Sequence, residues 1–373
     1  MDDEFERFVQ PSVYFVGFTQ VDENEVSRYL IDTGNQQFLE SVDLALKQGL
    51  SWAEILCSMF AKLCYKSLTL GKNSNVSRTR DIWDNLVGCF DTAHGSIFEH
   101  VQFNFLIRDC SRVFTHELVR HRIGTAFSQT SGRYCRIENM QLVWDPILNP
   151  VRDLFETCAA QIEKTVYLAE CRLGLRKPPG GLSKHLFAED LTFGNYNAVR
   201  NAGLLIEKSY RDHVPDVIKA LLSTPKDAAG DWSGEVVAEL AHHLKWEPDN
   251  SFNFDIRKKM TSAIRRIAPN GQSNEIAFSC NLRTLRHTVL MRTAKFAEWE
   301  IRFVFAKIFE MVKAKYPLAF YGAKTRMIEG IPEVYGMRMQ PYELSAQMAL
   351  DEMSDEELTR YLKTRPRSTT QAV

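Results

Sequence analysis

The sequence predicts an α+β fold, because stretches typical of β-strands alternate with longer stretches that have the apolar spacing of helices. Ser12–Thr19 (SVYFVGFT) is rich in β-branched and aromatic residues, and Val101–Ile107 (VQFNFLI) alternates between apolar and polar side chains, so both are predicted strands. Ser51–Tyr65 carries apolar residues at helical spacing and is predicted to be a buried helix.

The remaining elements follow from the same patterns. Helices are also predicted at Glu23–Leu30, Arg80–Phe90, Pro150–Leu173 and Phe296–Lys315, and a strand at Met140–Trp144. Lys177–Gly181 (KPPGG) breaks the chain. Residues 174–250 then give helical pieces joined by turn-rich segments, which predicts a helical insertion. Its predicted helices are Tyr196–Val214, Asp216–Leu222 and Glu235–Leu244.

Composition is that of an ordinary soluble globular protein, with 373 residues, 45% hydrophobic and 25% charged. The net charge of -1 gives no global basic field that would attract nucleic acid or a membrane, so clustered arginines must act locally. The acidic start (MDDEFERF) does not resemble a signal peptide, and no apolar stretch approaches the length of a membrane span. We therefore expect a cytoplasmic protein without nucleic-acid or membrane partners.

The eight cysteines form no CxxC pair and no regular framework, which predicts reduced thiols in the core or near a site. His94 and His100 lie six residues apart, but a third ligand at a fixed offset is lacking. No metal site is therefore predicted.

The stretch from Thr115 to Arg136 concentrates cations around small hydroxyl and amide residues. Residues 111–122 are predicted to form a helix with Ser111 as N-cap. Three consecutive helical side chains fan through roughly 200 degrees, so Arg120–Arg122 (RHR) cannot all face one core. These cations could simply complement the helix dipole, at a fraction of a kcal/mol each.

Ser131–Arg133 (SGR) favours an anion-binding role for this stretch over a simple interaction with the helix dipole. It offers a hydroxyl, an unobstructed backbone N–H and a planar fork of donors, which suits an oxyanion such as phosphate. The sequence contains neither GxGxxG nor GxxxxGK[ST], so this would not be a glycine-rich phosphate loop.

RHR followed by Ser131–Tyr134 (SGRY) resembles the signature of the flavin-dependent thymidylate synthases. The spacer Ile123–Thr130 has eight residues where that family usually has seven. Because Gln129 keeps its expected place, two positions before Ser131, we expect the extra residue between Ile123 and Phe127.

Other segments resemble the family in the same order. Ala61–Ser67 (AKLCYKS) resembles its Ala-x-Leu-Cys-Tyr-Ser segment, which implies that Cys64 is a packing thiol in the core. His94–His100 (HGSIFEH) resembles a His-Glu-Thr-Pro-Phe-Glu-His-like segment, with departures at positions 95–97. Arg265–Pro269 (RRIAP) resembles an Arg-x-x-x-Pro segment. Asn281–His287 (NLRTLRH), Arg292 and Glu298–Arg302 (EWEIR) resemble the Asn-x-Arg-Ser-Leu-x-His…Leu-x-Leu-Arg…Ala-Gln-x-Glu-Ile-Arg block of the family.

The resemblance implies a mixed sheet flanked by long helices and a catalytic domain over residues 1–325 that contains the insertion at about 174–250. Residues 326–373 would be a C-terminal extension, in which Ser354 and Glu357 form a capping box. Its last ten residues or so (TRPRSTTQAV) are polar and expected to be disordered. The family also implies a homotetramer with active sites between subunits.

The implied reaction is reductive methylation of dUMP to dTMP, with methylenetetrahydrofolate as carbon donor, FAD as redox carrier and NADPH as reductant. By resemblance, FAD is held by Ser96, Arg120, His121, Arg122, Gln129, Asn281, Arg283 and His287. The dUMP pocket is lined by Glu117, Arg120, Gln129, Ser131, Gly132, Arg133, Arg265 and Arg292. His94 lies where the folate stacks.

Arg292 matches the family residue that acts in catalysis, where a cation beside the N3–C4 edge of uracil stabilises the developing anion. No protein thiol has to attack the ring in this mechanism. None of the eight cysteines is followed by His, unlike the Pro-Cys-His setting of the unrelated cysteine-dependent thymidylate synthases.

Helix geometry constrains the last block. Arg283 and His287 share a face, but Arg292 lies nine residues beyond Arg283, about 180 degrees around an ideal helix. Either the segment through Arg283 is not helical, or different subunits share the site. Arg286 and Arg302 are predicted to form surface salt bridges.

Glu117 stands where the family usually has Gln. An ionised carboxylate only accepts hydrogen bonds, so it either alters substrate choice or pairs with a neighbouring arginine. A second hypothesis is therefore a flavin enzyme of the same fold that alkylates a different pyrimidine nucleotide. A third is a non-enzymatic nucleic-acid-binding module, whose affinity would fall steeply with salt and which would hold no flavin.

Overall fold

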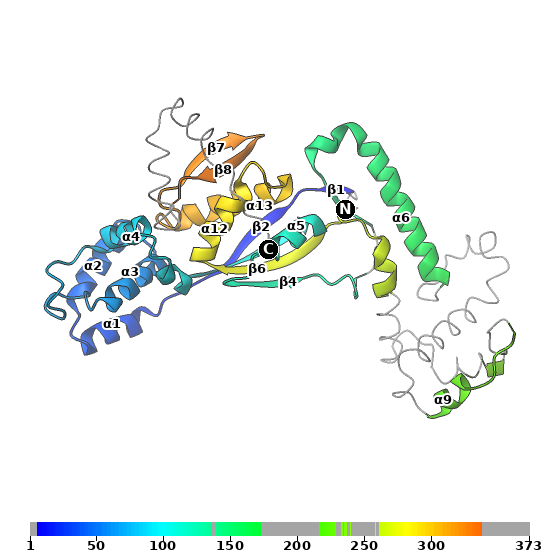
Figure 1. Cartoon of the computed structure of the whole chain (residues 1–373), viewed down its shortest axis with the longest axis horizontal. Coiled ribbons are helices and arrows are strands. Elements are labelled where there is room, and N and C mark those ends of the chain that lie inside the picture. The colour runs from blue at the N-terminus through cyan, green and yellow to red at the C-terminus, as the bar shows by residue number, and fades with distance from the viewer. Residues whose placement is uncertain are drawn as a thin grey trace, which may run out of the picture. The chain divides into compact units, whose positions relative to one another are not determined.

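The chain folds into α-helices and β-strands in the computed structural model, and the predicted α+β class is confirmed (Figure 1). The structure describes residues 6–135, 137, 139–172, 216–228 and 261–337, with the single positions 233, 235, 236, 239 and 258. The strands are β1 (Phe8–Val9), β2 (Ser12–Phe18), β3 (Gln102–Cys110), β4 (Thr125–Gln129), β5 (Leu142–Val143), β6 (Asn274–Asn281), β7 (Lys324–Ile328) and β8 (Ile331–Tyr335). The helices are α1 (Glu23–Asp32), α2 (Gln37–Lys47), α3 (Trp52–Cys64), α4 (Ile82–Asp91), α5 (Arg112–Leu118), α6 (Arg152–Arg172), α9 (Asp216–Leu222), α12 (Leu282–Thr293) and α13 (Trp299–Lys315). Short 3-10 helices are η1 (Gly95–His100), η2 (Pro146–Val151) and η4 (Arg265–Ile267).

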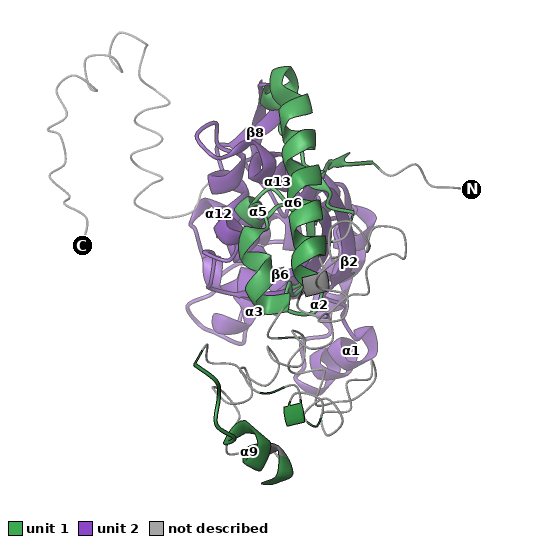
Figure 2. Cartoon of the chain, turned by 90° about the vertical axis from the view of Figure 1, so that its right-hand side faces the viewer, with its two compact units in different colours: residues 1–10, 109–113, 129–274 green, residues 11–108, 114–128, 275–373 purple. Residues whose placement is uncertain are grey.

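The chain divides into two compact units that interleave along the sequence (Figure 2). Unit 1 comprises residues 1–10, 109–113 and 129–274, and unit 2 comprises residues 11–108, 114–128 and 275–373.

A four-stranded sheet, which belongs chiefly to unit 2, has the strand order β2-β3-β6-β4. Strands β2 and β3 are antiparallel, with Phe15 opposite Phe105. In β3 the buried Phe103, Phe105 and Ile107 alternate with more exposed neighbours, as the sequence pattern predicts for a strand with one face in the core.

Helix α13 packs against β2 and α12 and closes the core of unit 2. Phe305 of α13 lies edge-on to Phe278 of β6, with 6.1 Å between ring centroids, and Phe278 stacks against Phe105. Glu298 caps α13 by accepting hydrogen bonds from the backbone of Glu300 and Ile301. This packing fixes α12, which follows β6 and precedes α13 in the sequence and which carries several predicted site residues.

The β7–β8 hairpin packs on α12 and α13 and holds the end of α12. Backbone N–H of Val334 donates to Thr293 Oγ1 at 3.0 Å, and the N–H of Lys295 donates to Glu333 Oε1 at 3.0 Å. The domain boundary expected at 325/326 falls inside β7, and the hairpin belongs to unit 2.

Unit 1 has its own small core around the parallel pair β1–β5. Phe8, Leu142 and Trp144 are buried together with Met140 and Ala159. Arg7 ties this core to α6, because its guanidinium donates to the Met140 carbonyl at 2.9 Å and forms an ion pair with Glu163 at 3.0 Å.

Most predicted elements are present within a few residues of their expected bounds. Helices α1, α3, α4, α6, α9 and α13 and strands β2, β3 and β5 match the predictions. The predicted helices Tyr196–Val214 and Glu235–Leu244, and the segment from Ser354 onward, lie wholly or largely outside the described residues. Within the described part of the chain, no helix has the length and apolarity needed to cross a membrane.

Two predictions about these elements are wrong. The helix expected over 111–122 ends at Leu118, because Val119 and Arg120 form a turn and the chain then enters β4. Cys64 is exposed rather than buried, because it is the last residue of α3 and the buried face of that helix carries Cys57 and Ala61 instead. Of the cysteines whose side chains the structure describes, Cys57, Cys89, Cys110 and Cys280 are buried, and none of those described forms a disulfide bond.

Glu54 joins the start of α3 to the segment after α13. It forms a capping box with Ser51, and its Oε1 accepts a hydrogen bond from the buried backbone N–H of Leu318 at 2.7 Å. Burial raises the pKa of this carboxyl, while the hydrogen bonds from Ser51 and Leu318 act in the opposite direction. One side chain therefore satisfies donors from two parts of unit 2.

We expect Glu54→Ala to destabilise the protein by about 2–3 kcal/mol, because it leaves buried donors without an acceptor. Calorimetry would show a thermal midpoint lower by several degrees, whereas Glu40→Ala, in the exposed first turn of α2, would leave it nearly unchanged. Equal midpoints for the two variants would contradict this role of Glu54.

Candidate active site

The loop after α5 docks on the first turn of α12. The backbone N–H of Asn281 donates to the Gly124 carbonyl at 3.1 Å, and Thr284 Oγ1 donates to the Ile123 carbonyl at 2.8 Å. Asn281 also caps α12, since its side chain accepts from the N–H of Thr284 at 2.8 Å. The loop that carries Arg120, His121 and Arg122 is therefore fixed to the start of α12.

Gly124 allows this close approach. Its φ of +66° lies in the left-handed region, and an added Cβ would lie 2.2 Å from Asn281 Nδ2. The turn at Ile123–Gly124 falls in the segment where the sequence predicts the extra residue of the spacer.

A cavity of about 630 Å³ opens beside this junction, within the size range of small-molecule sites. Six of the predicted flavin-binding residues line it: Arg120, His121, Arg122, Asn281, Arg283 and His287. Phe90 and Phe98, stacked with 4.3 Å between ring centroids, supply apolar wall. Arg283 forms an ion pair at 2.6 Å with Glu99, which also lines the cavity. The lining thus combines cations for phosphate groups with aromatic surface.

The surface salt bridges predicted for Arg286 and Arg302 are wrong in part. Arg286 is buried in the wall of the cavity, where it lies over the Phe90 ring and donates to the carbonyls of Ala319 and Tyr321. Burial lowers its pKa to about 9. Arg302 does pair with the exposed Glu329, but its own side chain is only 2% exposed. Backbone carbonyls accept hydrogen bonds from both guanidinium groups, in Arg302 from Nη2 to the Ile328 carbonyl at 2.7 Å. The side-chain pattern of the sequence does not reveal these acceptors.

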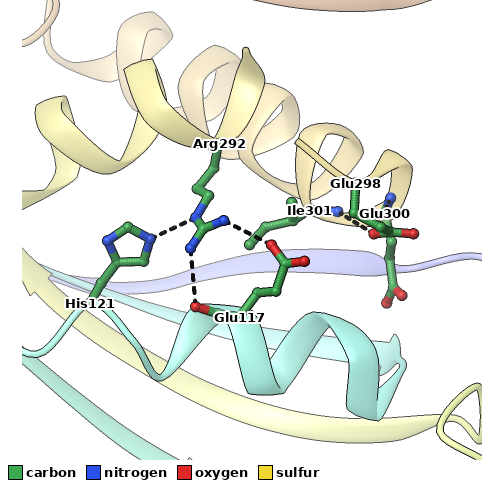
Figure 3. Close-up of polar contacts among 6 residues, drawn as sticks. All are labelled: Glu117, His121, Arg292, Glu298, Glu300 and Ile301. Atoms are coloured by element: carbon green, nitrogen blue, oxygen red, sulfur yellow. Dashed lines mark hydrogen bonds and ion pairs between the residues drawn. The ribbon is translucent and has the colours of Figure 1, made fainter. Parts of the chain in front are cut away.

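Arg292 lies in a second, more open hollow of about 750 Å³, together with Glu117, Phe296 and Glu298. Its Nη1 donates to Glu117 Oε2 at 2.8 Å, its Nη2 to the Glu117 carbonyl at 3.4 Å, and its Nε to His121 Nε2 at 2.7 Å (Figure 3). A guanidinium has five N–H donors, so two remain for a ligand. Arg120 and Arg122 line both the hollow and the cavity.

The hydrogen bond from Arg292 determines the protonation of His121. Because Nε2 accepts, the imidazole is neutral and carries its proton on Nδ1. Burial, the positive charge of Arg292 and the nearby His287 together lower the pKa of His121 to about 4. His121 is therefore a neutral acceptor at physiological pH.

Both arginines of the α12 block lie on one continuous helix, so the option that the segment through Arg283 is not helical is wrong. Arg283 contributes to the cavity and Arg292 to the hollow, as their opposite positions on a helix require. The pairing expected between Glu117 and a neighbouring arginine is confirmed by its ion pair with Arg292.

The remaining predicted nucleotide residues belong to unit 1 (Figure 2). Ser131 begins a turn in which the N–H groups of Tyr134 and Cys135 donate to its carbonyl, and the N–H of Arg133 donates to its Oγ at 3.3 Å. The Arg265 side chain lies over Gly132, with Cδ 3.5 Å from the position of an added Cβ. The turn and Arg265 are thus brought together, and Arg133 is exposed.

Three further residues of the predicted site line neither the cavity nor the hollow. His94 and Ser96 are exposed at the start of η1, next to Gly95, which lines the cavity. Gln129 ends β4 and belongs to unit 1. Among the described residues, no group of three His, Cys, Asp or Glu side chains is arranged to hold a metal ion.

Sequence reasoning missed several residues of the site. Glu99, the partner of Arg283, lies in the HGSIFEH segment, and Arg286 lies one helical turn after Arg283, so position could have indicated both. Phe296, which is 88% exposed and lines the hollow, gave no pattern in the sequence.

Comparison with known families gives the decisive observation. The model of a family described as thymidylate synthase complementing protein (Thy1) matches residues 46–318, which is most of the chain. The chain belongs to the flavin-dependent thymidylate synthase family.

Relatives in this family are distant. The flavin-dependent thymidylate synthase of Corynebacterium diphtheriae is 23% identical over 287 residues, which span 77% of this chain and 85% of the relative. That of Geobacter sulfurreducens is 35% identical over 91 residues, or 24% of this chain and 39% of the relative.

Two solved structures are also similar. The UMP/dUMP methylase PolB from Streptomyces cacaoi, bound with 5-Br dUMP, is 12% identical with a TM-score of 0.39 over 84% of this chain and 95% of that one. Thymidylate synthase X from Helicobacter pylori, with FAD and dUMP, is 16% identical with a TM-score of 0.33 over 72% of this chain and 92% of that one.

Membership of the flavin-dependent thymidylate synthases makes the chain an FAD-dependent methyltransferase, so the alternative of a non-enzymatic nucleic-acid-binding module is wrong. The 630 Å³ cavity fits the cofactor of the family, because its arginines can pair with a diphosphate and its phenylalanines can contact a flat ring system.

We expect Gly124→Ala to lower the FAD content of this flavin-dependent thymidylate synthase about tenfold or more, because the added methyl group pushes the loop off Asn281. Gly49→Ala is the matched control. Gly49 has φ +87° and no atom within 4 Å of an added Cβ, so the variant bears the backbone strain without the collision. Equal flavin content in the two variants, measured by absorbance after denaturation, would show that the docking contact is not needed.

We expect the His121 imidazole signal to keep its neutral-form chemical shift in an NMR titration from pH 8 to pH 5, because its pKa is lowered to about 4. The unfolded chain takes up this proton near pH 6.5, so His121 reduces stability as the pH falls from about 6.5 towards 4. Arg292→Gln removes the neighbouring charge and raises the midpoint, and His121→Asn identifies the signal. A midpoint near 6.5 in the parent protein would refute the assignment.

Proposed function

We propose that the chain catalyses the reductive methylation of dUMP to dTMP, with methylenetetrahydrofolate as carbon donor and NADPH as reductant. The observation that carries this proposal is the guanidinium of Arg292, held by Glu117 and His121 in a hollow that shares Arg120 and Arg122 with the flavin-sized cavity. A site for a pyrimidine would thereby adjoin a site for FAD.

The residues around Arg292 suit this chemistry. Attack by uracil C5 on a carbon electrophile requires extra electron density in the ring, as an anion delocalised over the N3–C4 carbonyl edge, and a preorganised cation lowers the energy of that anion. Glu117 and His121 use three of the N–H donors of Arg292 and orient the other two. Because His121 stays neutral, it orients Arg292 without adding a competing positive charge.

Flavin binding is proposed for Arg120, His121, Arg122, Asn281, Arg283 and His287, with Ser96 and Gln129 as further contacts. When bound, FAD would carry reducing equivalents from NADPH to the transferred carbon. Arg122 and Arg283 would pair with the phosphate groups, and His94 would stack against the folate. Ser131, Gly132, Arg133 and Arg265 would hold the nucleotide. We further propose a homotetramer with sites between subunits, located in the cytoplasm.

A second candidate is alkylation of a different pyrimidine nucleotide. The observation that favours it is the Glu117 carboxylate in the hollow, 2.8 Å from Arg292. An ionised carboxylate accepts hydrogen bonds only, and cytosine offers an amino donor at C4 where uracil offers a carbonyl acceptor.

We expect the flavin-loaded protein to convert dUMP to dTMP under anaerobic conditions with NADPH and methylenetetrahydrofolate, as measured by chromatography of the nucleotides. Arg292→Gln should lower the turnover number by about 100-fold or more while FAD stays bound, because one positioned cation contributes on that order. Arg28→Gln, which removes an exposed arginine paired with Glu25 on α1, is the control with unchanged turnover.

The same assay with dCMP and UMP separates the two candidates. Turnover of dUMP alone supports thymidylate synthesis. Turnover of dCMP or UMP without dUMP would establish the second candidate, and Glu117→Gln should then shift the preference towards dUMP.

A further inference from the structure

Arg286 is a buried guanidinium in the wall of the flavin-sized cavity, and the proposed function gives it no role. The residue is 2% exposed and lies on α12, three positions after Arg283. Its Nη1 donates to the Ala319 carbonyl at 2.6 Å and its Nη2 to the Tyr321 carbonyl at 3.3 Å. Both acceptors are neutral, so they hold the guanidinium in place without cancelling its charge.

No carboxylate balances the charge of Arg286 in the part of the chain that the structure describes. Burial alone lowers its pKa to about 9, and no charged neighbour contributes. The group therefore stays protonated at neutral pH. Among the described residues that line the cavity, the one carboxylate is Glu99, which is paired with Arg283. A buried positive charge thus borders the cavity without a partner of opposite sign.

One face of this guanidinium packs on an aromatic stack. Its Cζ lies 4.4 Å from the centre of the Phe90 ring. Phe90 in turn stacks on Phe98 at 4.3 Å and on Tyr321 at 5.8 Å between ring centroids. Apolar surroundings screen a charge less than water does, so the field of Arg286 extends further than that of an exposed cation. The cavity therefore has a positive potential from a fixed source.

A cofactor that gains negative charge on reduction responds to such a field. A hydride donor transfers two electrons and one proton to oxidised FAD, so the donor is oxidised and the isoalloxazine gains one negative charge. At an effective dielectric constant of about 20, opposite unit charges about 10 Å apart shift an equilibrium on the order of tenfold. Direct contact between Arg286 and the ring is therefore not required.

We propose that Arg286 raises the reduction potential of the bound flavin, because its unbalanced buried charge makes the protein bind reduced FAD more tightly than oxidised FAD. This inference rests on the proposed placement of FAD in the cavity. It gives a role to a residue outside the flavin-binding set that the family resemblance implies, and the role needs the charge of the side chain rather than its packing.

Anaerobic reduction of the flavin-loaded, full-length protein in equilibrium with a reference dye measures the potential independently of turnover. We expect Arg286→Gln, which removes the charge but keeps a side-chain amide donor, to reduce the preference for reduced over oxidised FAD about tenfold. For a two-electron couple this lowers the potential by about 30 mV.

Arg302→Gln is the matched control. Arg302 is also 2% exposed and also donates to a backbone carbonyl, that of Ile328 at 2.7 Å, but it does not line the cavity. Its replacement should lower the thermal midpoint while the potential of the flavin stays at the parental value.

A parental potential in Arg286→Gln would overturn the proposal, as would an equal decrease in both variants. If Arg286→Gln holds no flavin, the parent protein decides. Its FAD should have a potential above that of free FAD, and a potential at or below that of free FAD would overturn the proposal. A parent protein that binds no flavin would refute the proposed function together with this inference, whereas flavin binding with a parental potential in Arg286→Gln refutes the inference alone.

Discussion

The docking of one loop on one helix start is the constraint on which the site in unit 2 depends. Hydrogen bonds from Asn281 and Thr284 to the carbonyls of Gly124 and Ile123 fix the loop after α5 against α12. Gly124 is the residue that permits this approach, because its φ is positive and its neighbour Asn281 leaves no space for a side chain. Cations from two distant segments thereby line one cavity.

Helix α12 contributes to both the cavity and the hollow, because its residues face different directions. Arg283 contributes to the flavin-sized cavity and Arg292 to the hollow, while His121 lines the cavity and accepts a hydrogen bond from Arg292. The β7–β8 hairpin holds the end of α12 through Thr293 and Lys295, adjacent to Arg292. A cation in a partly buried network of this kind is preorganised, so little reorganisation is needed when charge develops on a ligand.

The sequence predicted the helices with strong amphipathic spacing and the segments that line the cavity, because both have recognisable local residue patterns. It did not predict the features that depend on tertiary contacts. The helix predicted over residues 111–122 ends at Leu118, where the backbone forms a turn, and the loop beyond it is held by hydrogen bonds with Asn281 and Thr284. Arg286 is buried because carbonyls after α13 accept its hydrogen bonds.

Hydrogen–deuterium exchange of the full-length protein, with and without FAD, tests the docking of the loop on α12 most directly. Amides in this junction should exchange together, since the two segments share hydrogen bonds. We expect FAD to slow exchange in residues 120–125 and 281–287 at the same time. Protection by FAD in neither segment, or in one without the other, would contradict it.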